Sequence, residues 1–73
     1  MSGIIRVSVT SSNLRSVGYD PSSETLEVEF HDSGVYQYSN VPPNIHDALM
    51  GASSHGKYFA ANIKGRFTFN RIR

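Results

Sequence analysis

The clearest pattern of apolar and polar positions lies in residues 25–31, where the two kinds alternate strictly. One face carries the apolar side chains and the other carries the polar ones: Leu26, Val28 and Phe30 against Thr25, Glu27, Glu29 and His31. Because successive side chains of a β-strand point to opposite faces, we predict a strand with one face in the core and the other in solvent.

A tight turn follows this strand. Asp32 and Ser33 are typical turn residues, and Gly34 adopts a positive φ at little cost. Residues 35–38 are therefore expected to return antiparallel, as the second arm of a hairpin.

Two further strands are predicted before this hairpin. Ile4–Val9 is rich in β-branched residues and alternates in part, and Leu14–Tyr19 is the second candidate. Polar residues 10–13 separate the two, and Asp20–Ser23 end the second strand with turn-forming residues.

A short helix is predicted over Pro43–Met50. Proline suits the first helical position, because its missing N–H would have no intrahelical acceptor there. Ile45 and Leu49 lie four residues apart and fall on one apolar face. Gly51 is expected to end this helix.

A second, shorter helix is predicted to follow, with Ser53 or Ser54 as its capping residue. Phe59 and Ile63 lie on its apolar face. After it, residues 66–72 alternate again, which predicts a final strand.

The order of these elements predicts an α+β fold: a small antiparallel β meander packed against one or two short helices, with a C-terminal strand returning to the sheet. Seventy-three residues are too few for two independent cores, so residues 1–73 are expected to form a single domain. The chain has no cysteine. Since domains this small often depend on a disulfide, a metal or a second subunit, self-association is one hypothesis for this chain.

Charge is segregated along the chain, although the formal net charge is only +1. The charged residues of segment 20–32 are all acidic, and those of segment 57–73 are all basic. Either the two segments form separate acidic and basic surfaces, or they pair with each other across the sheet.

The remaining sequence features exclude several classes of protein. No apolar run approaches the roughly 18 residues of a membrane span, and the first residues lack the features of a signal peptide, so we expect a soluble, cytoplasmic protein without a membrane partner. His31, His46 and His55 lack zinc-ligand spacing, so neither a metal nor a cofactor is expected. No catalytic nucleophile, base and acid can be grouped by spacing, and the chain is not expected to be an enzyme.

Aromatic and basic residues in the second half of the chain indicate a nucleic-acid interface. The segments Tyr-Gln-Tyr at 36–38 and Phe-Thr-Phe at 67–69 each place two rings on one face of a predicted strand, as in sheet-based RNA-binding proteins. Such rings are equally typical of the core of a small domain, and the sequence leaves their direction open. The residues predicted to bind nucleic acid are two stacking rings and four cations: Tyr36, Tyr38, Lys57, Lys64, Arg66 and Arg71.

A second candidate site lies at the start of the second predicted helix. Backbone amides, hydroxyls and one ammonium come together there as an anion site for a small nucleotide: Ser53, Ser54, Gly56 and Lys57. Residues 51–57 also fit the first positions of a P-loop, but Tyr58 replaces the serine or threonine that would bind magnesium. A plain capped helix start explains the same residues without any ligand.

Short motifs follow one another in a recognisable order: Ser-Ser-Asn-Leu-Arg-Ser-Val-Gly-Tyr-Asp at 11–20, Leu-Glu-Val-Glu-Phe at 26–30, Gly-Val-Tyr-Gln-Tyr at 34–38, Val-Pro at 41–42, Ser-His-Gly-Lys-Tyr-Phe at 54–59 and Ile-Lys at 63–64. Together they resemble the KTSC domain, named after a C-terminal segment of some lysyl-tRNA synthetases. The resemblance runs from Val9 to Arg71, and residues 36–38 supply the family's Tyr-x-Tyr motif. Ala60 stands where the family usually has asparagine, and Phe67 stands where tyrosine is common.

The resemblance implies a small domain of bacterial or phage origin whose function is not established, with RNA binding indicated by its association with tRNA synthetases. The leading hypothesis is an RNA-binding module that uses the basic C-terminal strand and the Tyr-x-Tyr rings. One alternative is a protein-interaction or homo-oligomerisation module that uses a strand edge or the acidic face of Glu27 and Glu29. Another is a small-nucleotide binder that uses the helix start at Ser54–Lys57.

Overall fold

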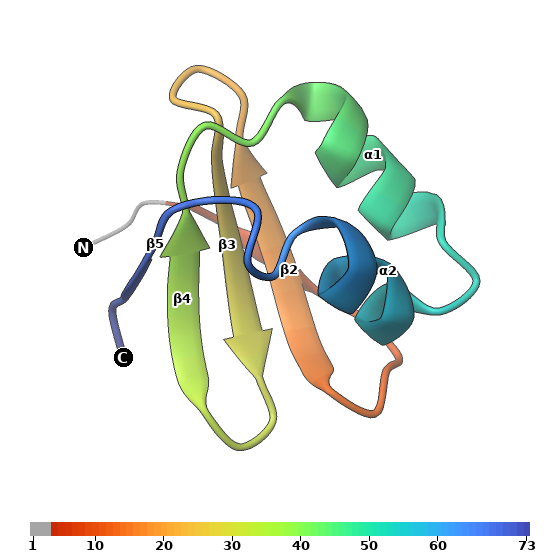
Figure 1. Cartoon of the computed structure of the whole chain (residues 1–73). Helices are drawn as coiled ribbons and strands as arrows, with labels where there is room; N and C mark the ends of the chain where they lie inside the picture. The colour runs from red at the N-terminus through yellow and green to blue at the C-terminus, as the bar shows by residue number, and fades with distance from the viewer. Residues whose placement is uncertain (1–3) are drawn as a thin grey trace.

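The computed structural model describes residues 4–73, which form β1 (Arg6–Ser8), β2 (Leu14–Asp20), β3 (Thr25–Phe30), β4 (Gly34–Tyr38), α1 (Pro43–Gly51), α2 (His55–Asn62) and β5 (Phe69–Arg71). The strands make one antiparallel sheet in the order β1-β2-β3-β4-β5. In Figure 1, β5 runs along the outer edge of β4, and the two helices lie beside each other against the sheet. Within residues 4–73, neither helix has the length and apolar character needed to cross a membrane.

The helix-facing side of the sheet carries the hydrophobic core. Leu26 and Val28 on β3 are fully buried, as the alternation predicts. The register pairs Leu26 with Tyr38 and Val28 with Tyr36, so both tyrosines also face the helices. The other buried residues of this core come from β2, from the segment before α1 and from the helical region: Leu14, Val17, Val41, Leu49, Phe59 and Ile63.

Both helices begin where the sequence predicts. Pro43 is the first residue of α1, and Leu49 is buried on its inner face. Ser54 caps α2, where its Oγ accepts a hydrogen bond from the backbone N–H of Lys57 at 3.3 Å. That cap fixes the start of the helix, so Phe59 packs into the core against the sheet.

The C-terminal strand is shorter than the alternating segment 66–72. β5 contains only Phe69–Arg71, which pair with β4. Arg66 still belongs to the turn after α2, because its backbone N–H donates a hydrogen bond to the carbonyl of Ile63 at 3.0 Å, and its Nε donates to the carbonyl of Ala61 at 3.1 Å. Phe67 lies outside the strand and packs against the core. The predicted α+β fold, with a last strand that returns to the meander, is confirmed.

The prediction that Glu27 faces solvent is wrong. Its side chain lies on the face of the sheet away from the helices, as the alternation requires, but it is 0% exposed. Arg6 of β1 forms an ion pair with its carboxylate, and Gln37 Nε2 donates a hydrogen bond to it at 2.9 Å. Figure 1 shows why: β1, the red segment, crosses behind the other strands and covers this face.

Gly18 allows β1 to cross so closely. A Cβ atom at this position would lie 2.6 Å from Ile4 Cγ2 and 2.7 Å from the carbonyl oxygen of Ile5. Both distances are shorter than real Cβ contacts, so any larger residue would push β1 away from β2.

Arg6 also determines how the acidic segment is neutralised. Its guanidinium pairs with Glu27 and approaches Glu29 to 4.0 Å. Ser16 Oγ connects Arg6 to Glu29. It accepts a hydrogen bond from Arg6 Nε and donates one to Glu29 Oε1, each at 2.9 Å. Within the described part of the chain, the acids of β3 therefore pair with β1 and not with the basic C-terminal segment.

Candidate functional site

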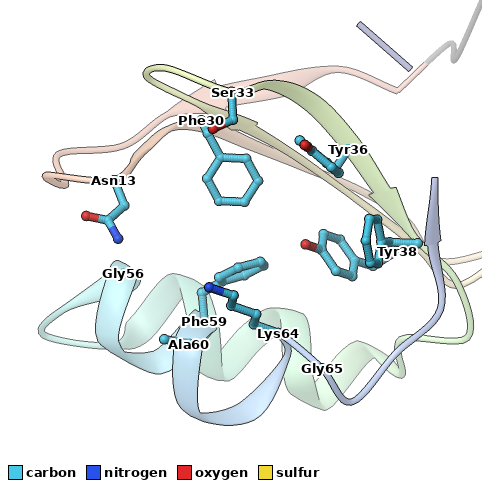
Figure 2. A pocket seen from close by; sticks show the side chains of 11 residues that line it. Asn13, Phe30, Ser33, Tyr36, Tyr38, Gly56, Phe59, Ala60, Lys64 and Gly65 are labelled. Atoms are coloured by element: carbon cyan, nitrogen blue, oxygen red, sulfur yellow. The ribbon is translucent and has the colours of Figure 1, made fainter. Parts of the chain in front are cut away.

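An open cavity of about 380 Å³ lies between the helix-facing side of the sheet and α2. Figure 2 shows the sheet above this cavity and α2 below it. Rings form most of its wall, with polar and small residues around them: Phe30, Tyr36, Tyr38, Phe59 and Phe69, then Asn13, Ser33, Lys64, Gly56, Ala60 and Gly65. Small-molecule sites in proteins have volumes of about 300–1,000 Å³, so the cavity is large enough for one small ligand.

Five aromatic rings contact one another in a closed cycle around this cavity. Successive ring centres are 5.3–5.6 Å apart, in the order Phe30, Tyr36, Phe69, Tyr38, Phe59 and back to Phe30. These separations are typical of edge-to-face and tilted pairs, in which each ring orients its neighbour. The aromatic wall is therefore held in place by β3, β4, β5 and α2 together.

The register of β4 and β5 explains why these rings share one side. Tyr38 lies opposite Phe69, and Tyr36 lies opposite Arg71. Residues directly opposite each other in an antiparallel pair point to the same face. Tyr38 faces the core with 5% of its surface exposed, whereas Phe69, at the edge of the same face, is 51% exposed.

The hydroxyl of Tyr38 points into the cavity (Figure 2). No polar side-chain atom of residues 4–73 is both buried and without a partner, so this hydroxyl, which makes no hydrogen bond within those residues, is open to the cavity although the residue as a whole is only 5% exposed. Burial raises the pKa of Tyr38 above its ordinary value of 10.0, and the nearby Tyr36 raises it further. At neutral pH the hydroxyl is therefore protonated, and it can donate or accept a hydrogen bond in the space that a ligand would occupy.

Two of the predicted cations lie beside the ring cycle. Lys64 lines the cavity, and its ammonium is directed toward the enclosed space in Figure 2. The guanidinium carbon of Arg71 lies 6.0 Å from the centre of the Tyr36 ring, and its Nε donates to the carbonyl of Arg73 at 2.9 Å. Within residues 4–73, neither Lys64 nor Arg71 forms an ion pair with an aspartate or glutamate side chain. No acidic side chain therefore competes with an anionic ligand for these two cations.

The other predicted binding residues lie outside the cavity wall. Lys57 and Arg66 are exposed, and neither lines the cavity. At the predicted anion site, the Ser54 hydroxyl is used as the cap of α2, Ser53 is exposed, and Gly56 alone reaches the cavity. The anion site stays a prediction. Of the residues predicted to bind nucleic acid, four lie together at the cavity: Tyr36, Tyr38 and Lys64 line it, and Arg71 lies beside Tyr36.

Asn13 and Phe30 belong to the cavity but were not predicted as site residues. The signal for Phe30 was present, because the alternation places it on the core face and the hairpin register sets it beside Tyr36. Asn13 lies just before β2 and approaches the first turn of α2, where a Cβ on Gly56 would be 3.6 Å from Asn13 Cγ. That contact joins distant segments, and no local pattern indicates it.

The histidines make contacts within the fold. His31 and His55 each lie within hydrogen-bond distance of a backbone carbonyl oxygen, at 2.9 and 2.8 Å. His46 stacks on Tyr19, with ring centres 4.6 Å apart. Across residues 4–73, no three histidine, aspartate or glutamate side chains gather into a group that would hold a metal ion.

A second cavity, of about 460 Å³, lies between β1 and α1. Ile5 and Val7 on its rim are 87% and 59% exposed. Within residues 4–73, the wall of this second cavity contains one charged side chain, that of Asp47, and no lysine or arginine. The surface is therefore largely apolar and lacks cations. Its chemistry favours a protein contact over a nucleic-acid contact.

Both the sequence and the structure resemble known proteins. The sequence model of the KTSC domain family matches residues 10–67 of this chain. A protein of Stutzerimonas stutzeri is 50% identical over 54 residues, which cover 74% of this chain and 76% of that protein. A lysine–tRNA ligase of Nostoc punctiforme is 36% identical over 59 residues, which cover 81% of this chain but only 10% of the ligase. The crystal structure of a KTSC domain protein from Yersinia pestis, 41% identical, superposes with a TM-score of 0.95 and covers 97% of this chain and 100% of its own.

Proposed function

The chain belongs to the KTSC domain family, and from that premise we propose that it binds unpaired RNA, with one base in the aromatic cavity and the adjoining phosphates at Lys64 and Arg71. The observation that carries this proposal is the closed cycle of five rings around an open cavity of about 380 Å³. Because binding of this kind involves no chemical step, we propose that the chain is a binding module and not an enzyme.

The cavity has the chemistry of a site for one base. Nucleobases stack on aromatic side chains, and each stacked base contributes about 1–3 kcal/mol to binding. Phe69 is 51% exposed beside the cavity, and its ring offers a stacking surface at the edge of the sheet. A base within a duplex is already stacked and paired, so an unpaired strand suits this site.

Two cations support binding of the phosphates next to that base. Lys64 reaches the cavity from the end of α2, and Arg71 lies beside Tyr36 on β5. A guanidinium over a ring makes a cation–π contact while its N–H groups remain able to bind phosphate oxygens. The formal net charge of +1 is low for a nucleic-acid-binding domain, so we propose a short footprint of a few nucleotides.

A relative supports RNA as the ligand. The lysine–tRNA ligase of Nostoc punctiforme acts on tRNA, as its name states, and one segment of it is 36% identical to this chain. That segment is 10% of the ligase, so the proposal takes over only the contact with RNA and not the aminoacylation reaction.

The test is a backbone NMR titration of the ¹⁵N-labelled chain in about 50 mM salt, where phosphate contacts are strong. The probes are a mixed-sequence single-stranded RNA of eight nucleotides, the same strand paired in a duplex, and uridine monophosphate. We expect the single strand to shift the amides of Tyr36, Tyr38, Lys64 and Phe69 more than the duplex does. Absence of shifts with every RNA, or shifts confined to α1 and β1, would end the proposal, and equal shifts with the mononucleotide would favour a small-nucleotide binder.

A second candidate function, self-association, is favoured by two exposed apolar residues, Val7 on the edge strand β1 and Ile5 just before it. An unpaired strand edge next to an apolar surface is a common site of β-sheet extension between chains. Light scattering at high micromolar concentration tests it against the monomer mass of 8.1 kDa. A dimer that Val7→Lys returns to monomer supports this candidate, and a wild-type monomer removes it.

A further inference from the structure

The outer edge of β1 presents backbone groups that no other strand of residues 4–73 pairs with. In an antiparallel pair, residues whose N–H and C=O groups point to the neighbouring strand alternate with residues whose groups point away from it. Val9 N donates to Arg15 O at 3.1 Å, so the backbone groups of Val9 point to β2, and those of Val7 do the same two residues earlier. The backbone groups of Arg6 and Ser8 therefore point away from the sheet.

The apolar side chains next to this edge lie on one face of the sheet. Val7 pairs with the buried Val17, so it lies on the helix-facing side, and Ile5 and Val9 share that side by alternation. Ile5 is 87% exposed and Val7 is 59% exposed, and the second cavity separates them from α1. The edge thus combines unpaired backbone donors and acceptors with an uncovered apolar row, Ile5, Val7 and Val9.

The opposite edge of the sheet carries a protection that β1 lacks. Charged side chains and proline are the usual means by which edge strands avoid pairing with other chains. β5 carries Arg71, and Arg73 follows it, so two copies that met at this edge would bring like charges together. β1 contains no proline, and its one charged side chain, that of Arg6, is neutralised by Glu27 on the far face. Of the two edges, β1 is the one suited to pairing.

The charge and the apolar row of β1 select one register for a second copy. Only Arg6 and Ser8 can exchange hydrogen bonds across this edge, so a two-fold axis must pass through Arg6, Val7 or Ser8. An axis through Arg6 places two arginines directly opposite each other, which is destabilising, and an axis through Ser8 leaves Ile5 opposite a polar residue. An axis through Val7 pairs Arg6 with Ser8 of the second copy. It also sets Val7 against Val7 and Ile5 against Val9, so the apolar row contacts itself along its whole length.

We infer that β1 pairs two copies of this chain in antiparallel fashion, about a two-fold axis at Val7, and joins their sheets into one. The inference rests on the second candidate function, self-association, and gives that function its surface and register. Stable interfaces bury about 1,200–2,000 Å², more than two three-residue strands provide, so we expect a weak dimer that forms at high micromolar concentration. Because the apolar rows of both copies lie on the same face, both aromatic cavities open on one face of the joined sheet.

The test uses single cysteines, because the chain has none of its own. Residues opposite each other in a non-hydrogen-bonded pair have Cα atoms about 4.5 Å apart, within the range of a disulfide. Val7→Cys at high micromolar concentration in oxidised glutathione should form a linked dimer at least about tenfold faster than Ser8→Cys, whose two copies lie two residues out of register. Asn70→Cys, on β5, is the matched control for the other edge and should link as slowly as Ser8→Cys.

Mixed variants then fix the register. Ile5→Cys and Val9→Cys should each link slowly alone, since their own copies lie four residues apart along the pair, and quickly when the two proteins are mixed. Mass spectrometry identifies the linked pair. The wild type gives a measurement without any substitution: hydrogen exchange at the Arg6 and Ser8 amides should slow as the protein concentration rises, because these amides gain acceptors, whereas the amides of β5 should keep their rates.

The outcomes separate the register from self-association and from RNA binding. Val7→Cys that links no faster than Ser8→Cys overturns the inference, and so does exchange at Arg6 and Ser8 that is independent of concentration. If light scattering shows a dimer but Asn70→Cys links fastest, self-association stands and the pairing through β1 fails. If the wild type stays monomeric at high micromolar concentration, self-association and the inference both fail, and RNA binding in the aromatic cavity is unaffected.

Discussion

The guanidinium of Arg6, on the edge strand β1, forms an ion pair with the carboxylate of Glu27, in the middle of the sheet. The Glu27 side chain is 0% exposed, and that of Arg6 is 22% exposed. A buried carboxylate has lost its hydration and depends on its cation for compensation. The pair therefore connects β1 to β3 across the intervening β2.

We expect Arg6→Ala to lower the free energy of unfolding by about 3–5 kcal/mol, because it leaves the Glu27 charge buried without its cation. Urea unfolding followed by circular dichroism measures this change. Arg15→Ala is the matched control: Arg15 is an exposed arginine on β2, and its removal should change stability by no more than about 0.5 kcal/mol.

A double variant checks the cause of that loss. Arg6→Met combined with Glu27→Leu removes both charges and keeps apolar volume, so it should recover most of the stability. An Arg6→Ala protein as stable as Arg15→Ala would contradict the proposed role of the pair.

Gly34→Ala is expected to destabilise the fold and release the last residues of the chain. Gly34 has φ +93°, and a Cβ there would lie 1.9 Å from the carbonyl oxygen of Arg73, which accepts a hydrogen bond from Val35 N at 3.0 Å. The backbone strain alone costs about 1–3 kcal/mol. Urea unfolding gives the loss, and faster hydrogen exchange at the Val35 amide reports the release. Gly51→Ala, with nothing within 4 Å of its Cβ, is the control, and equal stability of the two variants would refute the prediction.

Lys64→Gln and Arg71→Gln should each reduce the salt dependence of RNA binding. Each phosphate contact with a single strand contributes about 0.7 to the slope of log affinity against log salt. Losing one contact should therefore lower the slope by about 0.7, measured between about 50 and 200 mM salt by fluorescence anisotropy. Arg15→Gln removes the same charge away from the cavity and should leave the slope as it is. A lower slope for Lys57→Gln but not for Lys64→Gln would place the phosphates elsewhere.

Stability should fall at alkaline pH in a way that depends on Tyr38. Burial raises its pKa above 10.0 in the folded chain, whereas an unfolded tyrosine ionises near pH 10. The folded state thus keeps the proton that the unfolded state loses, so the contribution is complete below about pH 10 and is lost as the pH rises above it. Thermal unfolding between about pH 9 and 11.5 should show a smaller decrease for Tyr38→Phe than for the wild type. Parallel decreases would show that Tyr38 does not cause the effect.

The strand alternation predicted much of the fold because it depends only on local geometry. The pattern at 25–31 predicts the buried Leu26 and Val28, and the hairpin at Gly34 follows from its turn residues. The same pattern failed for Glu27, since its burial depends on Arg6 from a strand that is distant in the sequence and crosses the far face. Alternation assigns a residue to a face of the sheet, but it does not show what covers that face.

The candidate site was predictable to the extent that sheet register determines it. Tyr36 and Tyr38 share a face by alternation, and Phe69 joins them once β5 pairs with β4. Asn13 required the approach of the segment before β2 to the first turn of α2, which only the folded chain shows. Ala60 lines the cavity as well, so this position places a methyl group in the wall and no polar group.

The ring cycle also supplies its own optical signal. The chain has no tryptophan, and two of its four tyrosines, Tyr36 and Tyr38, lie in the aromatic wall. Intrinsic emission excited near 280 nm therefore comes from tyrosine alone, and half of the emitting residues touch the cavity. A nucleobase stacked among these rings would quench that emission, so occupancy can be followed in solution without a dye, a tag or an isotope.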